Sequence, residues 1–221
     1  MKQEEKQLLK DGVQEIGLDL SPEQMEKLSD YLDLLLKWNK VFNLTSITTE
    51  REGVHKHLLD CLSLIPYLKK KKKPEFSTVA DVGSGGGLPA AVIAICLPDM
   101  VVHSIDAVGK KSLFVTQAAS QLGLSNLKAK HCRIENSGMV YDMVVCRAFS
   151  SLKTFAELTS QCVREDGIWI AMKGKLPLDE IKELPPAFQV KDLVQVNVPG
   201  LEEERTFVEF QRQVVKQLIV K

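Results

Sequence analysis

The amino-acid sequence predicts an α/β fold in which a doubly wound, mostly parallel sheet follows a helical N-terminal extension. Three observations support this prediction. Strand-like and helix-like patterns alternate from residue 77 onward, a glycine cluster follows the first strand-like segment, and residues 1–73 carry mainly helical periodicity. The chain of 221 residues is long enough to bury one sizeable core and to carry an appendage.

The N-terminal region is predicted to be helical. Residues 4–17 form a weak helical pattern. A clearer helix begins after Ser21, because Pro22 suits the first helical position and Gln24 can complete a capping box. Its apolar residues recur at helical spacing: Met25, Leu28, Leu32, Leu35 and Leu36. Thr49 can cap a third helix, which extends toward Ile65.

A run of five lysines, residues 69–73, and the following Pro74 end the helical region. We therefore divide the chain into an N-terminal helical region, 1–73, and a catalytic domain, 74–221. Such a charged run is ordinarily a solvated loop, and contact with phosphate is the alternative.

Residues 74–212 contain the patterns of a parallel sheet covered on both faces. Strands are predicted at 77–82, 101–105, 127–131, 142–146 and 167–172, and helices at 89–97, 109–122 and 152–164. Segments 188–197 and 205–212 alternate apolar and polar residues around a Pro199-Gly200 turn. They predict a closing hairpin whose strands run antiparallel to the rest.

The composition narrows the class of protein. The chain is 44% hydrophobic and 26% charged with zero formal net charge, so any nucleic-acid partner needs a local patch of positive charge. Residues 1–10 lack the apolar run of a signal peptide, and no segment reaches the ~20 apolar residues of a membrane span, so we expect a cytoplasmic protein. The five cysteines form no C-x-x-C pair and are expected to be reduced and mostly buried: Cys61, Cys96, Cys132, Cys146 and Cys162.

The glycine cluster is the most specific motif. Gly83, Gly85 and Gly87 follow the first predicted strand at G-x-G-x-G spacing, and Leu88 stands where a dinucleotide fingerprint would place its third glycine. Glycines reach positive φ and let a ligand approach the backbone. This spacing favours S-adenosyl-L-methionine over a nicotinamide dinucleotide.

Two carboxylates accompany this loop. Asp106 ends the second predicted strand, where a carboxylate can accept hydrogen bonds from ribose hydroxyls; capping the next helix is the alternative. Asp81 lies near the end of the first strand. Its carboxylate could bond loop amides or face the cationic end of the cofactor, and simple stiffening of the loop is equally compatible.

Cationic side chains follow the later strands. Arg147 ends the fourth strand and could grip a phosphate or carboxylate, although arginines at strand ends also form structural pairs. Lys173 follows the fifth strand, as a group in the crevice or as a surface lysine. These two are the candidate catalytic residues. His57 and Asp60, one helical turn apart, make a poor metal site and are expected to form a hydrogen-bonded strut beside the active site.

Taken in order, these segments resemble the small-subunit ribosomal RNA methyltransferase G family, also called glucose-inhibited division protein B. The resemblance covers roughly residues 20–212. It rests on the following segments: Trp38-Asn39, Asn43-Leu44-Thr45, His57-Leu58-Leu59-Asp60-Cys61, Asp81-Val82-Gly83-Ser84-Gly85-Gly86-Gly87-Leu88-Pro89, Asp106 with Lys110-Lys111, Arg133-Ile134-Glu135, Arg147-Ala148-Phe149 and Met172-Lys173-Gly174.

The resemblance implies a Rossmann-like class I S-adenosylmethionine-dependent methyltransferase that modifies N7 of one guanine in 16S ribosomal RNA. Carried over by position, the residues that contact the cofactor or line its site are Gly83, Leu88, Ile134, Glu135 and Arg147. The chain departs from the usual family residues at Cys61, Ala90, Cys132 and Ile134. The implied partner is 16S ribosomal RNA or an assembling small subunit. We expect a monomer, because nothing in the sequence indicates an obligate assembly. A non-catalytic RNA- or ribosome-binding adaptor with the same fold is the alternative.

Overall fold

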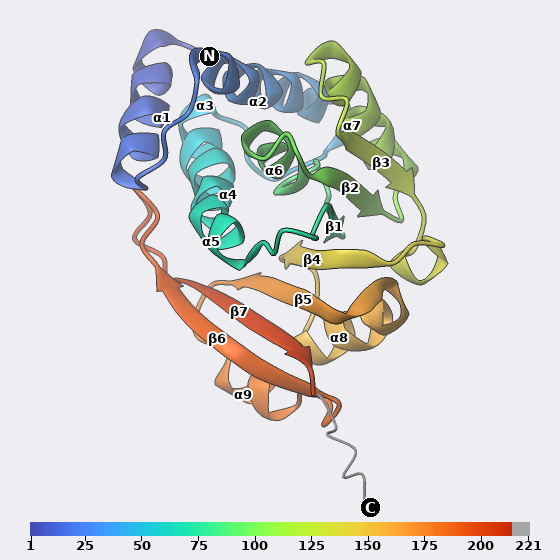
Figure 1. Ribbon diagram of the computed structural model, residues 1–221. Helices are drawn as coiled ribbons and strands as arrows, with labels where there is room; N and C mark the ends of the chain where they lie inside the picture. The colour runs from blue at the N-terminus through green and yellow to red at the C-terminus, as the bar shows by residue number, and fades with distance from the viewer. Residues whose placement is uncertain (214–221) are drawn as a thin grey trace, which may run out of the picture.

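A seven-stranded sheet forms the centre of the computed structural model, which describes residues 1–213 (Figure 1). The strands are β1 (Thr78–Val82), β2 (Val101–Asp106), β3 (Leu127–His131), β4 (Tyr141–Arg147), β5 (Val163–Lys173), β6 (Phe188–Val196) and β7 (Arg205–Arg212). Their order is β3-β2-β1-β4-β5-β7-β6, and the first five are parallel. The predicted α/β fold with a mostly parallel sheet is confirmed.

The closing hairpin corrects one expectation. β7 lies between β5 and β6 and is antiparallel to both. Because the two strands of a hairpin run in opposite directions and β7 takes the place beside β5, β6 runs in the same direction as the parallel strands. Only β7 is reversed, whereas the sequence predicted that both strands would be.

Helices cover both faces of the sheet. The helices and helical turns are α1 (Gln3–Glu15), α2 (Pro22–Phe42), α3 (Glu50–Gly53), η1 (Val54–Leu59), α4 (Asp60–Leu62), α5 (Leu64–Lys71), α6 (Ala90–Cys96), α7 (Gly109–Gln121), η2 (Ile134–Asn136), α8 (Leu152–Thr159), η3 (Ser160–Cys162) and α9 (Leu178–Lys182). In Figure 1 the helices before β3 lie above the sheet, whereas α8 and α9 lie below it.

The predicted start of α2 is confirmed in detail. The Gln24 amide donates to Ser21 Oγ at 3.2 Å, and the Ser21 amide donates to Gln24 Oε1 at 3.0 Å. Thr49 caps α3 on one side only, its Oγ1 accepting from the Glu52 amide at 3.3 Å. These capping bonds satisfy amides that a helix start leaves without partners.

The helix predicted at 152–164 is too long. α8 ends at Thr159, η3 follows, and Val163 already belongs to β5, where it pairs with Tyr141 of β4. A register shift then separates this pair from the Ile168–Met143 pair. The bulge lets one strand begin four residues earlier than the periodic pattern at 167–172 indicated.

The N-terminal helices share a hydrophobic core with the sheet. Leu28, Leu32 and Leu35 of α2 are at most 1% exposed and belong to the same cluster of buried side chains as α6, α7 and one face of the strands. A second cluster joins the other face to α8. The division at residues 73/74 stays a prediction, and the last eight residues of the domain assigned to 74–221 lie outside the described part of the chain.

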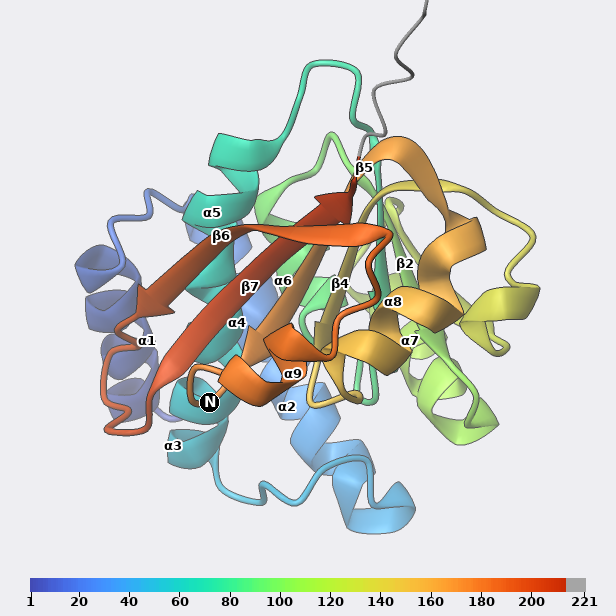
Figure 2. The same cartoon turned by 90° about the horizontal axis from the view of Figure 1, so that it is seen from below.

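The lysine run is not a solvated loop. It includes the end of α5, and three of its members form ion pairs: Lys71 with Glu209 at 2.8 Å, Lys72 with Asp99, and Lys73 with Asp166 at 2.8 Å. Figure 2 shows this segment at the edge of the sheet where the parallel strands begin. The end of α2 and the following loop extend past the opposite edge, where those strands end.

Two further sequence expectations concern the whole chain. The five cysteines are free thiols, and all but Cys132 are buried. Among residues 1–213, no helix is long and apolar enough to cross a membrane.

Candidate active site

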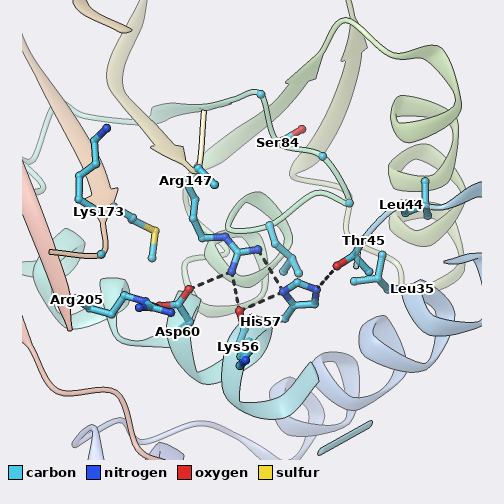
Figure 3. A pocket seen from close by; sticks show the side chains of 17 residues that line it. Leu35, Leu44, Thr45, Lys56, His57, Asp60, Ser84, Arg147, Lys173 and Arg205 are labelled. Carbon is cyan, nitrogen blue, oxygen red and sulfur yellow. Dashed lines mark hydrogen bonds and ion pairs between the residues drawn. The ribbon is translucent and has the colours of Figure 1, made fainter. Parts of the chain in front are cut away.

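A cavity of about 470 Å³ lies at the carboxyl ends of the central strands (Figure 3). Its walls come from the glycine loop after β1, from the ends of β4 and β5, from the start of β7, and from the N-terminal helices. Crevices at this edge are where open α/β sheets bind ligands. The cavity is therefore the candidate active site.

The glycine loop is open to the cavity at Gly85. This residue has φ of +57°, and a Cβ at its position would meet no atom within 4 Å. Gly87, with φ of +71°, is enclosed instead, because a Cβ there would lie 2.7 Å from Val115 Cγ2 and would collide with the Tyr31 hydroxyl. The missing side chain at Gly85 thus leaves space for a ligand, whereas the missing side chain at Gly87 leaves space for Tyr31 and Val115.

Helix α2 holds the glycine loop from above. The buried Tyr31 hydroxyl donates a hydrogen bond to the Gly86 carbonyl at 2.8 Å. Leu35, one turn further along α2, lines the cavity. The N-terminal region therefore contributes both a support for the loop and part of the cavity wall.

Asp81 is buried beneath the loop. Its Oδ2 accepts from the Ala90 amide at 2.9 Å, while Oδ1 has no hydrogen-bond partner within residues 1–213. Burial raises the pKa of this carboxyl to about 7, against the lowering effects of the Ala90 amide and Arg147. The observed contact joins β1 to the start of α6. A role toward the cofactor stays a prediction.

Asp106 organises two turns. Its Oδ2 accepts from the Gly85 amide at 2.9 Å, and its Oδ1 accepts from the Val108 amide at 2.8 Å, just before α7. Each carboxylate oxygen has a second lone pair, and Lys111 Nζ lies 3.6 Å from Oδ2, so Oδ1 is the less engaged acceptor for a ribose hydroxyl. Ribose binding by Asp106 stays a prediction.

Arg147 joins the end of β4 to the N-terminal helices (Figure 3). Its Nη1 donates to the Lys56 carbonyl at 2.9 Å and to Asp60 Oδ2 at 3.1 Å, and its Nη2 lies 3.3 Å from His57 Nδ1. The other Asp60 oxygen accepts from Arg205 Nε at 2.9 Å. The expected His57–Asp60 strut is therefore wrong as a direct contact: the two residues are linked through the guanidinium.

His57 is neutral at pH 7. Its pKa is lowered to about 4, first by burial and then by the charge of Arg147. Its Nε2 lies 2.9 Å from Thr45 Oγ1, and the Thr45 amide donates to Asn39 Oδ1 at 2.8 Å. His57 thus anchors the loop after α2 to the arginine without adding charge to the cavity.

Lys173 lines the cavity but is not free. Its Nζ donates to the Ser150 carbonyl and to Glu180 Oε2, both at 2.7 Å. The same Glu180 oxygen accepts from the Leu152 amide at the start of α8. The lysine therefore ties the end of β5 to α8 and α9.

The predicted site residues divide into two groups. Gly83, Gly85, Leu88, Arg147 and Lys173 line the cavity. The others lie outside its lining: Asp81, Gly87, Asp106, Ile134 and Glu135. Ile134 is packed into the core on the α8 side, and Glu135 is exposed on η2. The individual cofactor and catalytic roles stay predictions.

Sequence reasoning missed several cavity residues. Leu44 and Thr45 belong to a segment that carried the resemblance, but no pattern indicated that they reach the glycine loop. Lys56 and Arg205 had no signal, since each is one of many charged residues along the chain. Among the described residues, no group of three or more His, Cys, Asp or Glu side chains could hold a metal ion.

The strand order and the glycine loop define the class I S-adenosylmethionine-dependent methyltransferase fold. Solved structures with this fold include a mutant of MtNAS in complex with S-adenosylmethionine, with a TM-score of 0.60 and 12% identity over 87% of this chain and 72% of that chain. Another is the ribosomal protein L11 methylase from Lactobacillus delbrueckii subsp. bulgaricus, with a TM-score of 0.53 and 17% identity over 69% and 78%.

Sequence comparison gives the family. The model of rRNA small subunit methyltransferase G matches residues 24–214. Ribosomal RNA small subunit methyltransferase G of Acidovorax sp. strain JS42 is 45% identical, covering 89% of this chain and 91% of its own. The protein of the same name from Methylobacillus flagellatus is 42% identical, covering 91% and 96%. The chain belongs to the rRNA small subunit methyltransferase G family.

The site fits the cofactor of this class in three respects. Gly85 leaves its backbone open to the cavity, the carboxylate of Asp106 stands beside it, and the Arg147 guanidinium lies across the cavity. An adenosine, its ribose and an amino-acid carboxylate need such a surface, an acceptor and a cation respectively.

Proposed function

We propose that this protein transfers a methyl group from S-adenosylmethionine to N7 of one guanine in 16S ribosomal RNA. The observation that carries the proposal is the cavity beside the glycine loop, open at Gly85 and lined on its far side by cationic side chains. Membership of the family supports the substrate. We further propose that the protein acts as a monomer in the cytoplasm, on RNA or on an assembling small subunit.

In this proposal the glycine loop and its neighbours hold the donor. The backbone at Gly83 and Gly85 and the side chain of Leu88 lie against it, and Asp106 accepts from its ribose. The family pattern also assigns Ile134 and Glu135 to the cofactor site. When bound, S-adenosylmethionine supplies an electrophilic methyl group on its sulfonium.

Arg147 is proposed to bind the carboxylate of the donor. Its guanidinium is held by the Lys56 carbonyl and Asp60, so its direction is fixed before a ligand arrives. A preorganised donor loses less entropy on binding. Lys173, tied to Glu180, would line the cavity where the purine enters.

The chemistry requires no general base. Guanine N7 carries a lone pair and no proton, so a methyl transfer to it leaves nothing to deprotonate. The one histidine of the cavity among the described residues, His57, is a weak base with a pKa of about 4, and both its ring nitrogens are engaged. Acceleration would come from holding N7 in line with the methyl group in a partly dry cavity.

The adaptor alternative is disfavoured. A non-catalytic adaptor has no need for an open glycine loop, and the members of the matched family are named as methyltransferases. The same experiment separates the two, because an adaptor would leave guanine unmodified.

The test is nucleoside mass spectrometry of 16S ribosomal RNA from cells with and without the gene. We expect one 7-methylguanosine to disappear on deletion and to return with the wild-type gene. A Gly85→Ala gene should not restore it, whereas Gly123→Ala, a matched change at another open glycine with positive φ, should. Unchanged 7-methylguanosine after deletion would refute the proposed reaction.

A further inference from the structure

Arg205 reaches the cavity because β7 is the one reversed strand. It is the first residue of β7 and follows directly from the turn after β6, and its neighbour Thr206 pairs with Lys173 at the end of β5. The start of β7 therefore lies at the same edge as the ends of the parallel strands. Nothing else in the proposed mechanism uses this arginine.

The guanidinium of Arg205 is only partly occupied. Its Nε donates to Asp60 Oδ1 at 2.9 Å and its Nη1 donates to the Glu204 carbonyl at 2.9 Å. Within residues 1–213 its Nη2 forms no hydrogen bond, and 20% of the side chain is exposed. The arginine is thus fixed in place with donor capacity left over.

The charges around the cavity do not balance. Lys173 pairs with Glu180 at 2.7 Å, and Lys56 lies 3.7 Å from Glu203. Arg147 and Arg205, by contrast, share a single carboxylate, that of Asp60. Figure 3 shows Asp60 between the two guanidiniums. His57 adds no charge, so within ion-pairing distance the two guanidiniums face one carboxylate.

A second carboxylate affects only one of the two arginines. Asp81 is close enough to Arg147 to influence it, but it is fully buried beneath the glycine loop. Among the described residues Arg205 forms an ion pair with Asp60 alone, and the three glutamates that precede it, Glu202, Glu203 and Glu204, form none with it. Within the described part of the chain, Arg205 therefore has only the carboxylate that it shares with Arg147 as an ion-pair partner.

We propose that Arg205 binds a phosphate of the RNA substrate at the cavity, and that Asp60 is the positioning residue that holds it there. This inference rests on the proposed function and names a contact within the same site. A base that enters a pocket brings its flanking phosphates to the rim. A planar guanidinium with free N–H groups matches a phosphate, and the partial burial of Arg205 strengthens that contact over one made by a surface lysine.

The test compares Arg205→Gln, Arg205→Lys and a control, Arg164→Gln, which removes the same charge at the opposite edge of the sheet. Affinity for 16S ribosomal RNA from cells lacking the gene, and for small subunits from those cells, is measured over a series of salt concentrations. Affinity for S-adenosylmethionine is measured by calorimetry as a check that the cavity is intact.

Arg205→Gln should weaken RNA binding about 5- to 10-fold and lower the slope of log affinity against log salt by about 1, as expected for one lost phosphate contact. Arg205→Lys should keep the slope and recover part of the affinity. Arg164→Gln should change neither by more than about twofold. Donor affinity should stay within about twofold in all three.

The positioning role of Asp60 is tested by a double-mutant cycle. Asp60→Asn should weaken RNA binding in the wild-type background but have no further effect in the Arg205→Gln background, because it acts through that arginine. Equal effects in both backgrounds would overturn this role.

An unchanged salt slope in Arg205→Gln, or a donor affinity that falls as much as the RNA affinity, would overturn the phosphate contact. These results are distinct from a failure of the proposed function, in which the wild-type protein itself forms no 7-methylguanosine on either substrate. A wild-type protein that binds neither RNA nor subunits would overturn both.

Discussion

Alanine substitutions at three glycines with similar φ distinguish a glycine that faces the cavity from one that is packed against other residues. Gly85, Gly87 and Gly123 have φ of +57°, +71° and +63°. Alanine in this region costs about 1–2 kcal/mol of backbone strain at each position. Gly85→Ala and Gly123→Ala should lower the free energy of unfolding by only this amount, because an added Cβ would meet no atom within 4 Å at either position.

Gly87→Ala should lower the free energy of unfolding by more than the other two substitutions do. Its Cβ would lie 2.7 Å from Val115 Cγ2 and would collide with the Tyr31 hydroxyl, both in the packed core. Such overpacking adds about 1–3 kcal/mol, so the total loss should be about 2–5 kcal/mol. Urea denaturation of the three variants and the wild type measures these differences in the free energy of unfolding.

Calorimetric titration with S-adenosylmethionine gives the second readout. Gly85→Ala should weaken donor binding at least tenfold, because the alanine side chain would occupy part of the cavity. Gly123→Ala should leave donor binding unchanged, because Gly123 lies outside the lining of that cavity. Equal stability of Gly87→Ala and Gly123→Ala would contradict the packing at Gly87, and wild-type donor affinity in Gly85→Ala would contradict the ligand contact at Gly85.

Four further variants test the supports of the site. Tyr31→Phe should lower the free energy of unfolding by about 1–2 kcal/mol in denaturant titrations, since the Gly86 carbonyl loses its buried partner; no loss would contradict the support. Asp60→Asn should lower it by about 2–3 kcal/mol, because two partly buried guanidiniums lose their shared counter-ion, and full stability would show that water compensates them. Asp81 and His57 should contribute opposite pH dependences to the free energy of unfolding between about pH 4 and 7. The raised pKa of Asp81 makes stability fall as pH rises through this range, and the lowered pKa of His57 makes it rise. Relative to the wild type, the stability of Asp81→Asn should therefore rise more steeply with pH and that of His57→Gln less steeply; the same change of slope in both variants would exclude this assignment.

The fold was predictable where local patterns determine it. The apolar segment before Gly83, the capping residues at Ser21 and the alternation of strands and helices each act over a few residues, and the structure contains the corresponding elements. The boundary between α8 and β5 could not be predicted from local patterns, because the pairing of Val163 with Tyr141 and the following bulge depend on a neighbouring strand. The reversal of β7 alone depends on which strand of the hairpin lies beside β5.

The candidate site was predictable in its ligand-facing loop and not in its connections. The positive φ at Gly85 follows from residue type and spacing. The hydrogen bond from Tyr31 to Gly86 spans 55 residues, and the bond from Arg205 to Asp60 spans 145. Such pairs exist only after the helices have packed on the sheet, so no periodicity or spacing indicates them.

These connections change the interpretation of the N-terminal region. Helix α2 supports the glycine loop through Tyr31, and Asp60 fixes the two arginines that face the cavity from β4 and β7. A chain lacking these helices would leave the Gly86 carbonyl without its partner and both guanidiniums without their shared carboxylate. The protein can therefore present positive charge at the cavity although its formal net charge is zero. One carboxylate serves two arginines, which concentrates positive charge at the cavity without making the whole surface basic.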